Sequence, residues 1–280
     1  MKKCVVIIPV YKENPLKSEL ASFKQCLLVL NEHDIVICTY DSLSLNKYNE
    51  ISLSLNKSYN VEFFDVNYFK SVRGYNELCL NKVFYERFGE YEYMLIYQLD
   101  AWVFKDDLLY WCSKQYDYIG APQFYSNKQF KGIGNGGFSL RKIDYCLKIL
   151  NKCPFMPYAK PKYEINYYKK AYDALLKKKL LTLFIYLIRI ILKSFGHKNS
   201  IRYYSSSSND VNEDIIFSVM AKHAWGIDAN IPTYSEAIGF AFECYPSSLF
   251  LENNNTLPFG CHAFEKWEYA DFWSQYIDIK

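Results

Sequence analysis

Two kinds of apolar pattern alternate over about the first hundred residues of the chain. Continuous apolar runs rich in β-branched residues are typical of parallel strands that are covered on both faces. Segments with apolar positions at helical spacing separate these runs. Strands are predicted at 5–10, 35–40, 61–66 and 93–99, and helices at about 17–31 and 75–88. This β-α-β order predicts an α/β fold with a central, mostly parallel sheet and helices on both faces.

The pattern changes after about Pro154. Residues 158–208 are rich in Lys and Tyr, then apolar, and end in a serine run at 205–208. Strand and helix signals resume at Glu213 and continue to the end, and no internal repeat is visible. We therefore expect one domain over 1–280 that carries a helical, apolar insertion at 158–208.

Lysines flank the apolar part of this insertion within residues 177–193. As a helix, the apolar residues 180–192 would extend only about 20 Å, against about 30 Å of bilayer hydrocarbon. The segment suits an interfacial helix with its lysines near anionic headgroups. The alternative is a helix that packs on the core or in a homodimer interface.

Composition excludes several classes of protein. The chain has 280 residues, of which 50% are hydrophobic, and a formal charge of +3. It can bury a sizeable core, and it lacks the basic footprint of a nucleic-acid-binding protein. The nine cysteines form no Cys-x-x-Cys pair, which favours reduced structural thiols. The apolar run after Lys3 is too short for a signal peptide, so we expect a cytoplasmic protein, with the inner face of the plasma membrane as a second location.

Asp100 directly follows the apolar strand predicted at 93–99. A carboxylate at the end of a buried parallel strand lies at the ligand-binding edge of the sheet, where it suits a divalent cation bound to nucleotide phosphates. The alternative is an aspartate that caps the next element.

A glycine-rich segment, Gly134-Asn-Gly-Gly-Phe-Ser-Leu-Arg141, allows the backbone to approach a ligand closely. A tight hairpin turn would look the same, and the segment matches neither a Walker A loop nor a Rossmann fingerprint.

Two further patterns could carry chemistry. An apolar stretch follows Glu213 and Asp214. The two acids could simply stabilise the start of a helix through its dipole, or one of them could act as a general base. His262 lies in Pro258-Phe-Gly-Cys-His-Ala-Phe264, a predicted loop in which an imidazole could complete a metal site, although a lone histidine is more often structural.

The order of these features resembles the landmarks of GT-A-type glycosyltransferases. More closely, the chain resembles a bacterial family commonly encoded in capsule, O-antigen or lipooligosaccharide loci and first catalogued as a domain of unknown function. The resemblance covers about 1–155 and 209–265. It rests on Tyr75-Asn-Glu-Leu, Gln98-Leu-Asp, Tyr116-Asp-Tyr-Ile-Gly-Ala-Pro122, the glycine-rich segment and Glu213-Asp214.

The resemblance implies a single GT-A domain that transfers sugar from a nucleotide-sugar donor, by family habit a UDP-sugar, to a glycan or lipid-linked acceptor. Gln98-Leu99-Asp100 occupies the place of the Asp-x-Asp motif, so Asp100 and His262 would hold Mn²⁺ or Mg²⁺; Gln98 in place of the first acid weakens this metal site. The residues implied in donor binding are Pro9, Val10, Tyr11, Arg73, Tyr75, Asn76, Gln98, Leu99 and Asp100. The donor sugar and the acceptor would meet at Asn135, Gly136 and Gly137. The base of an inverting reaction would be Asp214, with Glu213 beside it.

Two other functions compete with this one. A nucleotidyltransferase would normally carry a glycine-rich loop with lysine after the first strand, and residues 10–15 contain no glycine. A non-catalytic carbohydrate-binding or scaffold protein that has kept the fold is compatible with the missing first acid.

Overall fold

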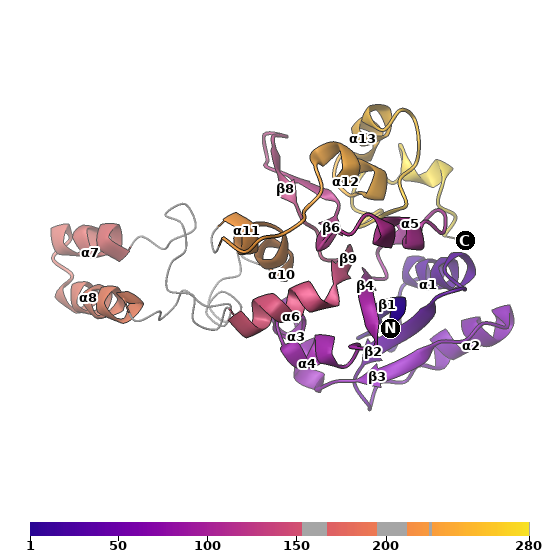
Figure 1. Ribbon diagram of the computed structural model, residues 1–280, viewed down its shortest axis with the longest axis horizontal. Helices are drawn as coiled ribbons and strands as arrows, with labels where there is room; N and C mark the ends of the chain where they lie inside the picture. Colours follow the sequence, from indigo (N-terminus) through magenta and orange to yellow (C-terminus); the bar gives the residue numbers. More distant parts are fainter. Residues whose placement is uncertain (153–166, 195–211, 224–225, 280) are drawn as a thin grey trace.

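The computed structural model describes residues 1–152, 167–194, 212–223 and 226–279 (Figure 1). Its centre is a six-stranded sheet in the order β3-β2-β1-β4-β9-β6. The strands of this sheet are β1 (Lys2–Pro9), β2 (Asp34–Thr39), β3 (Asn60–Phe63), β4 (Tyr91–Tyr97), β6 (Tyr118–Gly120) and β9 (Phe138–Lys142). The four strands from β3 to β4 are parallel, and β9 runs antiparallel to both β4 and β6. The predicted α/β class with a mostly parallel sheet is confirmed.

Helices cover both faces of this sheet because its central strands are apolar on both sides. Val6 and Ile8 of β1 belong to one core cluster, and Val5 and Ile7 belong to the other. The first cluster includes side chains of α1 (Lys17–Val29), α2 (Asn46–Leu55) and α5 (Leu108–Ser113). The second includes side chains of α3 (Val72–Cys79), α4 (Lys82–Glu86), α6 (Ile143–Lys152) and the π-helical turn η4 (Ile216–Met220).

The single helix predicted at 75–88 is wrong, because two helices, α3 and α4, occupy this region. Asn81 separates them: its side chain accepts a hydrogen bond from the Val83 N–H at 3.0 Å, so it starts a new helix as an N-cap. The strand predicted at 61–66 is shorter than expected, since β3 ends at Phe63 and a 3₁₀ turn, η1 (Val66–Phe69), follows.

A three-stranded sheet of order β10-β11-β5 lies beyond the end of β4. Its strands are β5 (Trp102–Val103), β10 (Ala241–Phe242) and β11 (Gly260–Cys261). The hairpin of β7 (Pro122–Phe124) and β8 (Phe130–Ile133) forms a third, two-stranded sheet. The remaining helices of this part of the chain are α10 (Glu213–Ile215), α11 (Ala221–His223), α12 (Tyr234–Phe240), α13 (Pro246–Glu252) and the 3₁₀ turn η5 (Trp273–Gln275).

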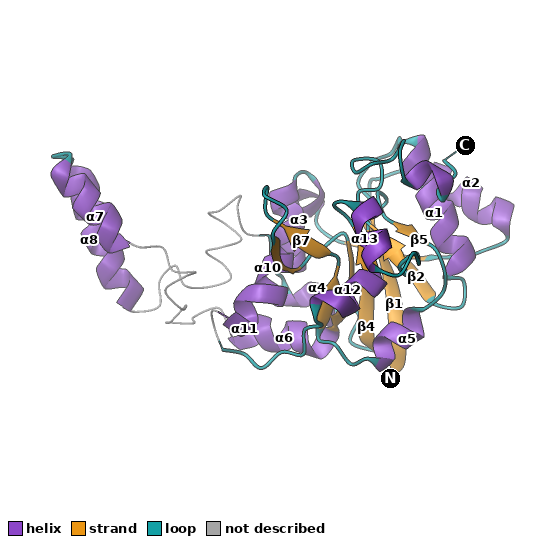
Figure 2. Ribbon diagram, turned by 90° about the horizontal axis from the view of Figure 1, so that it is seen from above, coloured by secondary structure: helices purple, strands orange, loops and turns teal. Residues whose placement is uncertain are grey.

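The insertion predicted at 158–208 is helical where it is described. It forms α7 (Tyr167–Leu176) and α8 (Leu180–Ser194), which pack side by side (Figures 1 and 2). The serine run at 205–208, His197 and the borders of the insertion lie outside the described residues.

A buried ion pair joins the central sheet to the helix that starts at Glu213. Arg141 of β9 is fully buried, and its Nη2 donates to Glu213 Oε1 at 2.8 Å. The same guanidinium donates to Ser139 Oγ at 3.0 Å and to the Tyr85 hydroxyl at 3.2 Å. Because a buried charge is stable only when it is paired, this interaction holds α10 against β9.

Replacing Arg141 by methionine should destabilise the protein by about 3–5 kcal/mol, because Glu213 would remain as an unpaired buried charge. The double variant Arg141→Met/Glu213→Leu should recover much of this loss, since no charge is left unpaired. Urea denaturation followed by circular dichroism measures both free energies of unfolding.

The matched control is Lys82→Met, which removes an exposed ion pair with Glu86 and should change stability by less than about 1 kcal/mol. If Arg141→Met and Arg141→Met/Glu213→Leu lose the same free energy of unfolding, the ion pair is not what stabilises this region.

Candidate functional site

Strand register places Asp100, His262 and Glu243 side by side. β11 runs parallel to β10, with Cys261 opposite Phe242, so the next residues, His262 and Glu243, are neighbours. β11 also runs antiparallel to β5, with Cys261 opposite Trp102. This pairing brings His262 to the turn between β4 and β5 that carries Asp100.

The His262 ring is surrounded by polar groups. Its Nε2 lies 3.1 Å from Asp100 Oδ1 and 3.3 Å from Gln98 Oε1. Its Nδ1 lies 3.0 Å from Asn135 Nδ2 and 3.4 Å from Glu243 Oε1. Two protonation states satisfy the ring: in the neutral ring Nδ1 accepts from Asn135 while Nε2–H donates to Asp100, and in the protonated ring Nε2–H still donates to Asp100 while Nδ1–H donates to Glu243.

These neighbours control the charges at the site. Burial alone would lower the pKa of His262, but the nearby carboxylates of Asp100 and Glu243 raise it to about 10. Burial likewise opposes ionisation of Asp100, yet His262 holds the pKa of this carboxyl below its ordinary value. The site is thus a histidine between two acids.

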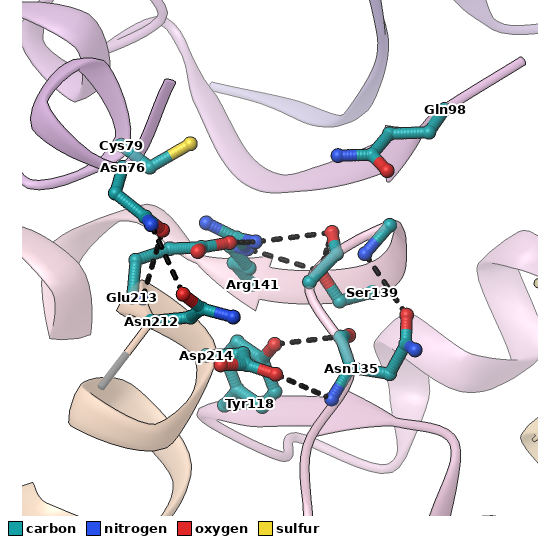
Figure 3. A network of polar contacts seen from close by, with 12 residues as sticks. Asn76, Cys79, Gln98, Tyr118, Asn135, Ser139, Arg141, Asn212, Glu213 and Asp214 are labelled. Carbon is teal, nitrogen blue, oxygen red and sulfur yellow. Dashed lines mark hydrogen bonds and ion pairs between the residues drawn. The ribbon is translucent and has the colours of Figure 1, made fainter. Parts of the chain in front are cut away.

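Asn135 connects this histidine to Asp214, and Figure 3 shows its contact with Asp214. Its backbone N–H donates to Asp214 Oδ2 at 3.0 Å, and its side-chain oxygen accepts from the Gly137 N–H at 2.9 Å. Its amide nitrogen then faces His262. Asn135 adopts a positive φ of 63°, a conformation that asparagine tolerates better than most residues.

Asp214 is buried at the start of α10 and accepts three hydrogen bonds. Oδ2 accepts from Gln123 Nε2 at 2.8 Å as well as from Asn135, and Oδ1 accepts from the Ile215 N–H at 2.7 Å. Burial, together with the adjacent Glu213, raises the pKa of Asp214 to about 6. Gln123, which is half-buried, is the side chain that covers Oδ2.

The glycines of the 134–141 segment allow these acids and the histidine to come close to the backbone. A Cβ on Gly136 would overlap Glu213 Oε1, and a Cβ on Gly137 would overlap the His262 ring. The Gly137 carbonyl also accepts a hydrogen bond from the Gln98 N–H at 2.8 Å, which aligns the segment with the end of β4. Close approach of side chains, rather than turn geometry, accounts for these two glycines.

Asn76 of α3 fixes the first residues of α10. Its Oδ1 accepts from the Glu213 N–H at 3.2 Å, and its Nδ2 donates to Asn212 Oδ1 at 3.1 Å (Figure 3). On the same helix, Tyr75 is half-buried with its hydroxyl beside Gln98, whereas Arg73 is exposed and pairs with Glu77.

The donor-binding residues expected after β1 differ in exposure. Tyr11 is exposed, whereas the side chains of Pro9 and Val10 are buried. Val10 and Leu99, both expected to bind the donor, belong to a core cluster. Their burial leaves only their backbone groups for a ligand.

The expected Mn²⁺ or Mg²⁺ site has two candidate ligands and one neighbouring amide. Among the described residues, no group of three or more His, Cys, Asp and Glu side chains forms a metal site. Asp100 Oδ1 and Gln98 Oε1 nevertheless each lie about as far from His262 Nε2 as two adjacent ligands of an octahedral ion, which are about 3 Å apart. Glu243 could accept the Nδ1 proton, as carboxylates commonly do for metal-binding histidines. These donors fit a divalent cation once His262 has lost its Nε2 proton, because only the neutral ring offers this nitrogen as a ligand.

Sequence reasoning missed Glu243 and Gln123 and gave Arg141 no role. Arg141 had a usable signal, because a basic residue inside an apolar strand requires a buried acid as its partner. Glu243 and Gln123 carry no such signal, since only the pairing of short strands brings them to the site.

Two surface hollows, of about 300 and 570 Å³, lie elsewhere. The smaller lies beside the start of β2, and the larger lies at the carboxyl ends of β2 and β3. Neither is lined by Asp100, Asp214 or His262.

Three solved structures are distantly similar to this chain. Core-mannan synthase A of Aspergillus fumigatus, in its Mn/GDP form, is 8% identical over 54% of this chain and 63% of its own, with a TM-score of 0.39. A cytidylyltransferase of Leptospira borgpetersenii serovar Hardjo-bovis is 8% identical over 54% and 64%, with a TM-score of 0.33. The glycosyltransferase GlyE of Streptococcus pneumoniae TIGR4 is 12% identical over 94% and 54%, with a TM-score of 0.43. The chain spans between 54% and 64% of the length of these three proteins.

A search of curated proteins finds no significant match. The profile of one protein family, described as "Protein of unknown function (DUF5672)", matches residues 58–262. This region includes Asp100, the glycine-rich segment, Glu213, Asp214 and His262, and it makes up most of the chain. The chain therefore belongs to the DUF5672 family.

Proposed function

We propose that this protein is a glycosyltransferase that moves a sugar from a nucleoside diphosphate, in the first place a UDP-sugar, to a hydroxyl group. A glycan or lipid-linked acceptor of bacterial surface polysaccharide synthesis, such as capsule or lipopolysaccharide, is the acceptor class. The observation that carries this proposal is the continuous network in which Asn135 joins the Asp100–His262 pair to Asp214.

The donor would bind across the carboxyl ends of β1 and β4, where α/β proteins commonly bind ligands. Exposed Tyr11 follows β1 and half-buried Tyr75 belongs to α3, so both are proposed to contact the donor. Asp100 and His262, with Gln98, would hold Mn²⁺ or Mg²⁺ at the diphosphate. When bound, such an ion stabilises the negative charge that develops on the leaving nucleoside diphosphate.

Asp214 is the proposed general base. Its carboxylate accepts the proton of the acceptor hydroxyl while the acceptor oxygen bonds to the anomeric carbon. The bond from that carbon to the diphosphate oxygen breaks, and the nucleoside diphosphate leaves with the electron pair. Attack on the face opposite the leaving group inverts the anomeric configuration. Because Gln123 covers Oδ2, the acceptor hydroxyl would take the place of its amide.

The second candidate is a non-catalytic carbohydrate-binding or scaffold protein. One observation favours it: both oxygens of Asp214 already accept hydrogen bonds from the protein, as a purely structural carboxylate would.

The experiment that tests the proposal is a screen of nucleotide sugars by thermal shift, with and without Mn²⁺, followed by an assay of donor hydrolysis without acceptor. A transferase should be stabilised by one donor class and should slowly release its nucleoside diphosphate. The variant Asp100→Asn should lose donor stabilisation, whereas Asp106→Asn, also an aspartate near β5, should keep it. Binding of free sugars without donor hydrolysis would favour the second candidate.

Replacing Asp214 by asparagine should lower turnover by at least about a hundredfold, the usual contribution of a general base, while the donor binds as before. Donor-saturated kinetics and donor titration measure the two effects separately. Gln123→Ala is the control, because it removes one hydrogen bond to Asp214 but keeps the carboxylate. Near-normal turnover of Asp214→Asn would contradict the role of Asp214 as the base. A loss of donor binding as large as the loss of turnover would contradict it too.

The pH dependence of turnover should show an acid limb near pH 6. Burial raises the pKa of Asp214 to about this value, and only the ionised carboxylate can accept a proton. Activity should therefore be complete above this pH and fall about tenfold per unit below it. An undiminished rate at about pH 4.5, with the fold intact by circular dichroism, would exclude Asp214 as the base.

A further inference from the structure

The two helices of the insertion expose an unusual amount of apolar surface. On α8, Leu180 and Leu181 are 74% and 75% exposed, and Phe184 is 60% exposed. The large apolar side chains exposed on this pair of helices are Tyr172, Leu175, Leu176, Leu180, Leu181, Phe184, Ile185, Leu187, Ile188 and Ile191. So many large exposed apolar side chains on one hairpin of a folded protein indicate an interaction site.

Packing between the helices does not bury this surface. α7 contributes its small residues, Ala171 and Ala174, which are 6% and 5% exposed. The leucines next to them, Leu175 and Leu176, remain exposed. The two helices therefore support each other and leave their large apolar side chains facing outward.

Three consecutive lysines form the turn between the helices. Lys177, Lys178 and Lys179 are all exposed and lie between the exposed leucine pairs 175–176 and 180–181. Cationic and apolar side chains thus alternate at the same end of the hairpin.

Positive charge is concentrated on this part of the chain. Residues 167–194 contain seven Lys and Arg and one Asp, a net charge of +6, whereas the whole chain carries +3. The rest of the protein therefore has three net negative charges. Apolar surface and positive charge gathered on one element of an otherwise acidic chain are the pattern of a helix that lies in an anionic lipid interface.

We propose that the hairpin of α7 and α8 docks this protein on the surface of an anionic lipid bilayer. The lysines of the turn would meet anionic headgroups, and the exposed leucines and Phe184 would enter the boundary with the acyl chains. α8 has 15 residues, which extend about 22 Å and fall short of about 30 Å of hydrocarbon. No helix in the described parts of the chain is long and apolar enough to cross a membrane. The hairpin would lie in the interface.

Charge favours lipid over a second copy of the chain as the occupant. Two copies that met through this surface would bring together two elements of +6 each. An anionic bilayer instead supplies the opposite charge and an apolar layer at the same place. The inference does not depend on the proposed enzymatic activity, although a lipid-linked acceptor would make such docking useful.

Flotation of the full chain with vesicles tests the proposal, using phosphatidylcholine alone and phosphatidylcholine mixed with phosphatidylglycerol. The protein should float with the anionic vesicles and far less with the neutral ones, and added salt should weaken binding. The variant Lys177→Gln/Lys178→Gln/Lys179→Gln should bind anionic vesicles about a hundredfold more weakly. The variant Leu180→Ser/Leu181→Ser/Phe184→Ser should also stay unbound, and it should fold normally because these side chains are exposed.

Matched controls remove the same groups elsewhere. Lys17→Gln/Lys24→Gln/Lys47→Gln takes three exposed lysines from α1 and α2, and Leu53→Ser takes an exposed leucine from α2. Both should float like the wild type.

Three outcomes would overturn the proposal. The wild type could fail to float with anionic vesicles, or the hairpin variants could float as well as the wild type. In the third outcome, the wild type does not float and is a dimer in solution, and the variant Leu180→Ser/Leu181→Ser/Phe184→Ser is a monomer. This result would identify a second copy of the chain as the occupant of the apolar surface.

Discussion

A guanidinium without exposed surface must have its charge balanced inside the protein, and in this chain Glu213 balances the charge of Arg141. The consequences extend beyond one ion pair. Arg141 belongs to a central strand, so the position of Glu213, and with it the first turn of α10, is set by the sheet. Asn76 holds the same turn from the side of α3. Asp214, the next residue, therefore has little freedom, and its carboxylate lies where the Asn135 backbone can donate to it.

Asn135 links Asp214 to the other half of the site, which contains His262 and Asp100. Its side chain lies between the Gly137 N–H and the His262 ring, and His262 in turn contacts Asp100. Residues far apart in the sequence thus form one polar network at the carboxyl ends of the central strands. The arrangement places the Asp100–His262 pair and a carboxylate of raised pKa on opposite sides of one asparagine. Such a separation suits a reaction in which negative charge develops on one side while a proton is accepted on the other.

Local patterns in the sequence predicted much of this fold and several parts of the site. The apolar runs located β1, β2 and β4 to within a few residues, because strands buried on both faces must be apolar throughout. The helix break at Asn81 could not be predicted from spacing, since the apolar period continues across it and only the side-chain cap reveals the new start. The place of Glu243 in the site was not predicted, for a different reason. Its position depends on the pairing of two-residue strands, which leave almost no trace in sequence. Leu99 occupies a motif position, and the motif did not reveal that its side chain fills the core.

The central claim is that Asp100 and His262 face the diphosphate of a donor on the same edge of the sheet as Asp214. A crystal structure of the protein with Mn²⁺ and UDP, with anomalous data collected at the manganese edge, tests it most directly. An anomalous peak should appear within coordination distance of Asp100 Oδ1 and His262 Nε2, with the diphosphate beside it. Asp214 should lie beyond the β-phosphate, on the side away from the ribose. UDP and manganese bound at another surface, with Asp100 and His262 still in contact only with each other, would contradict it.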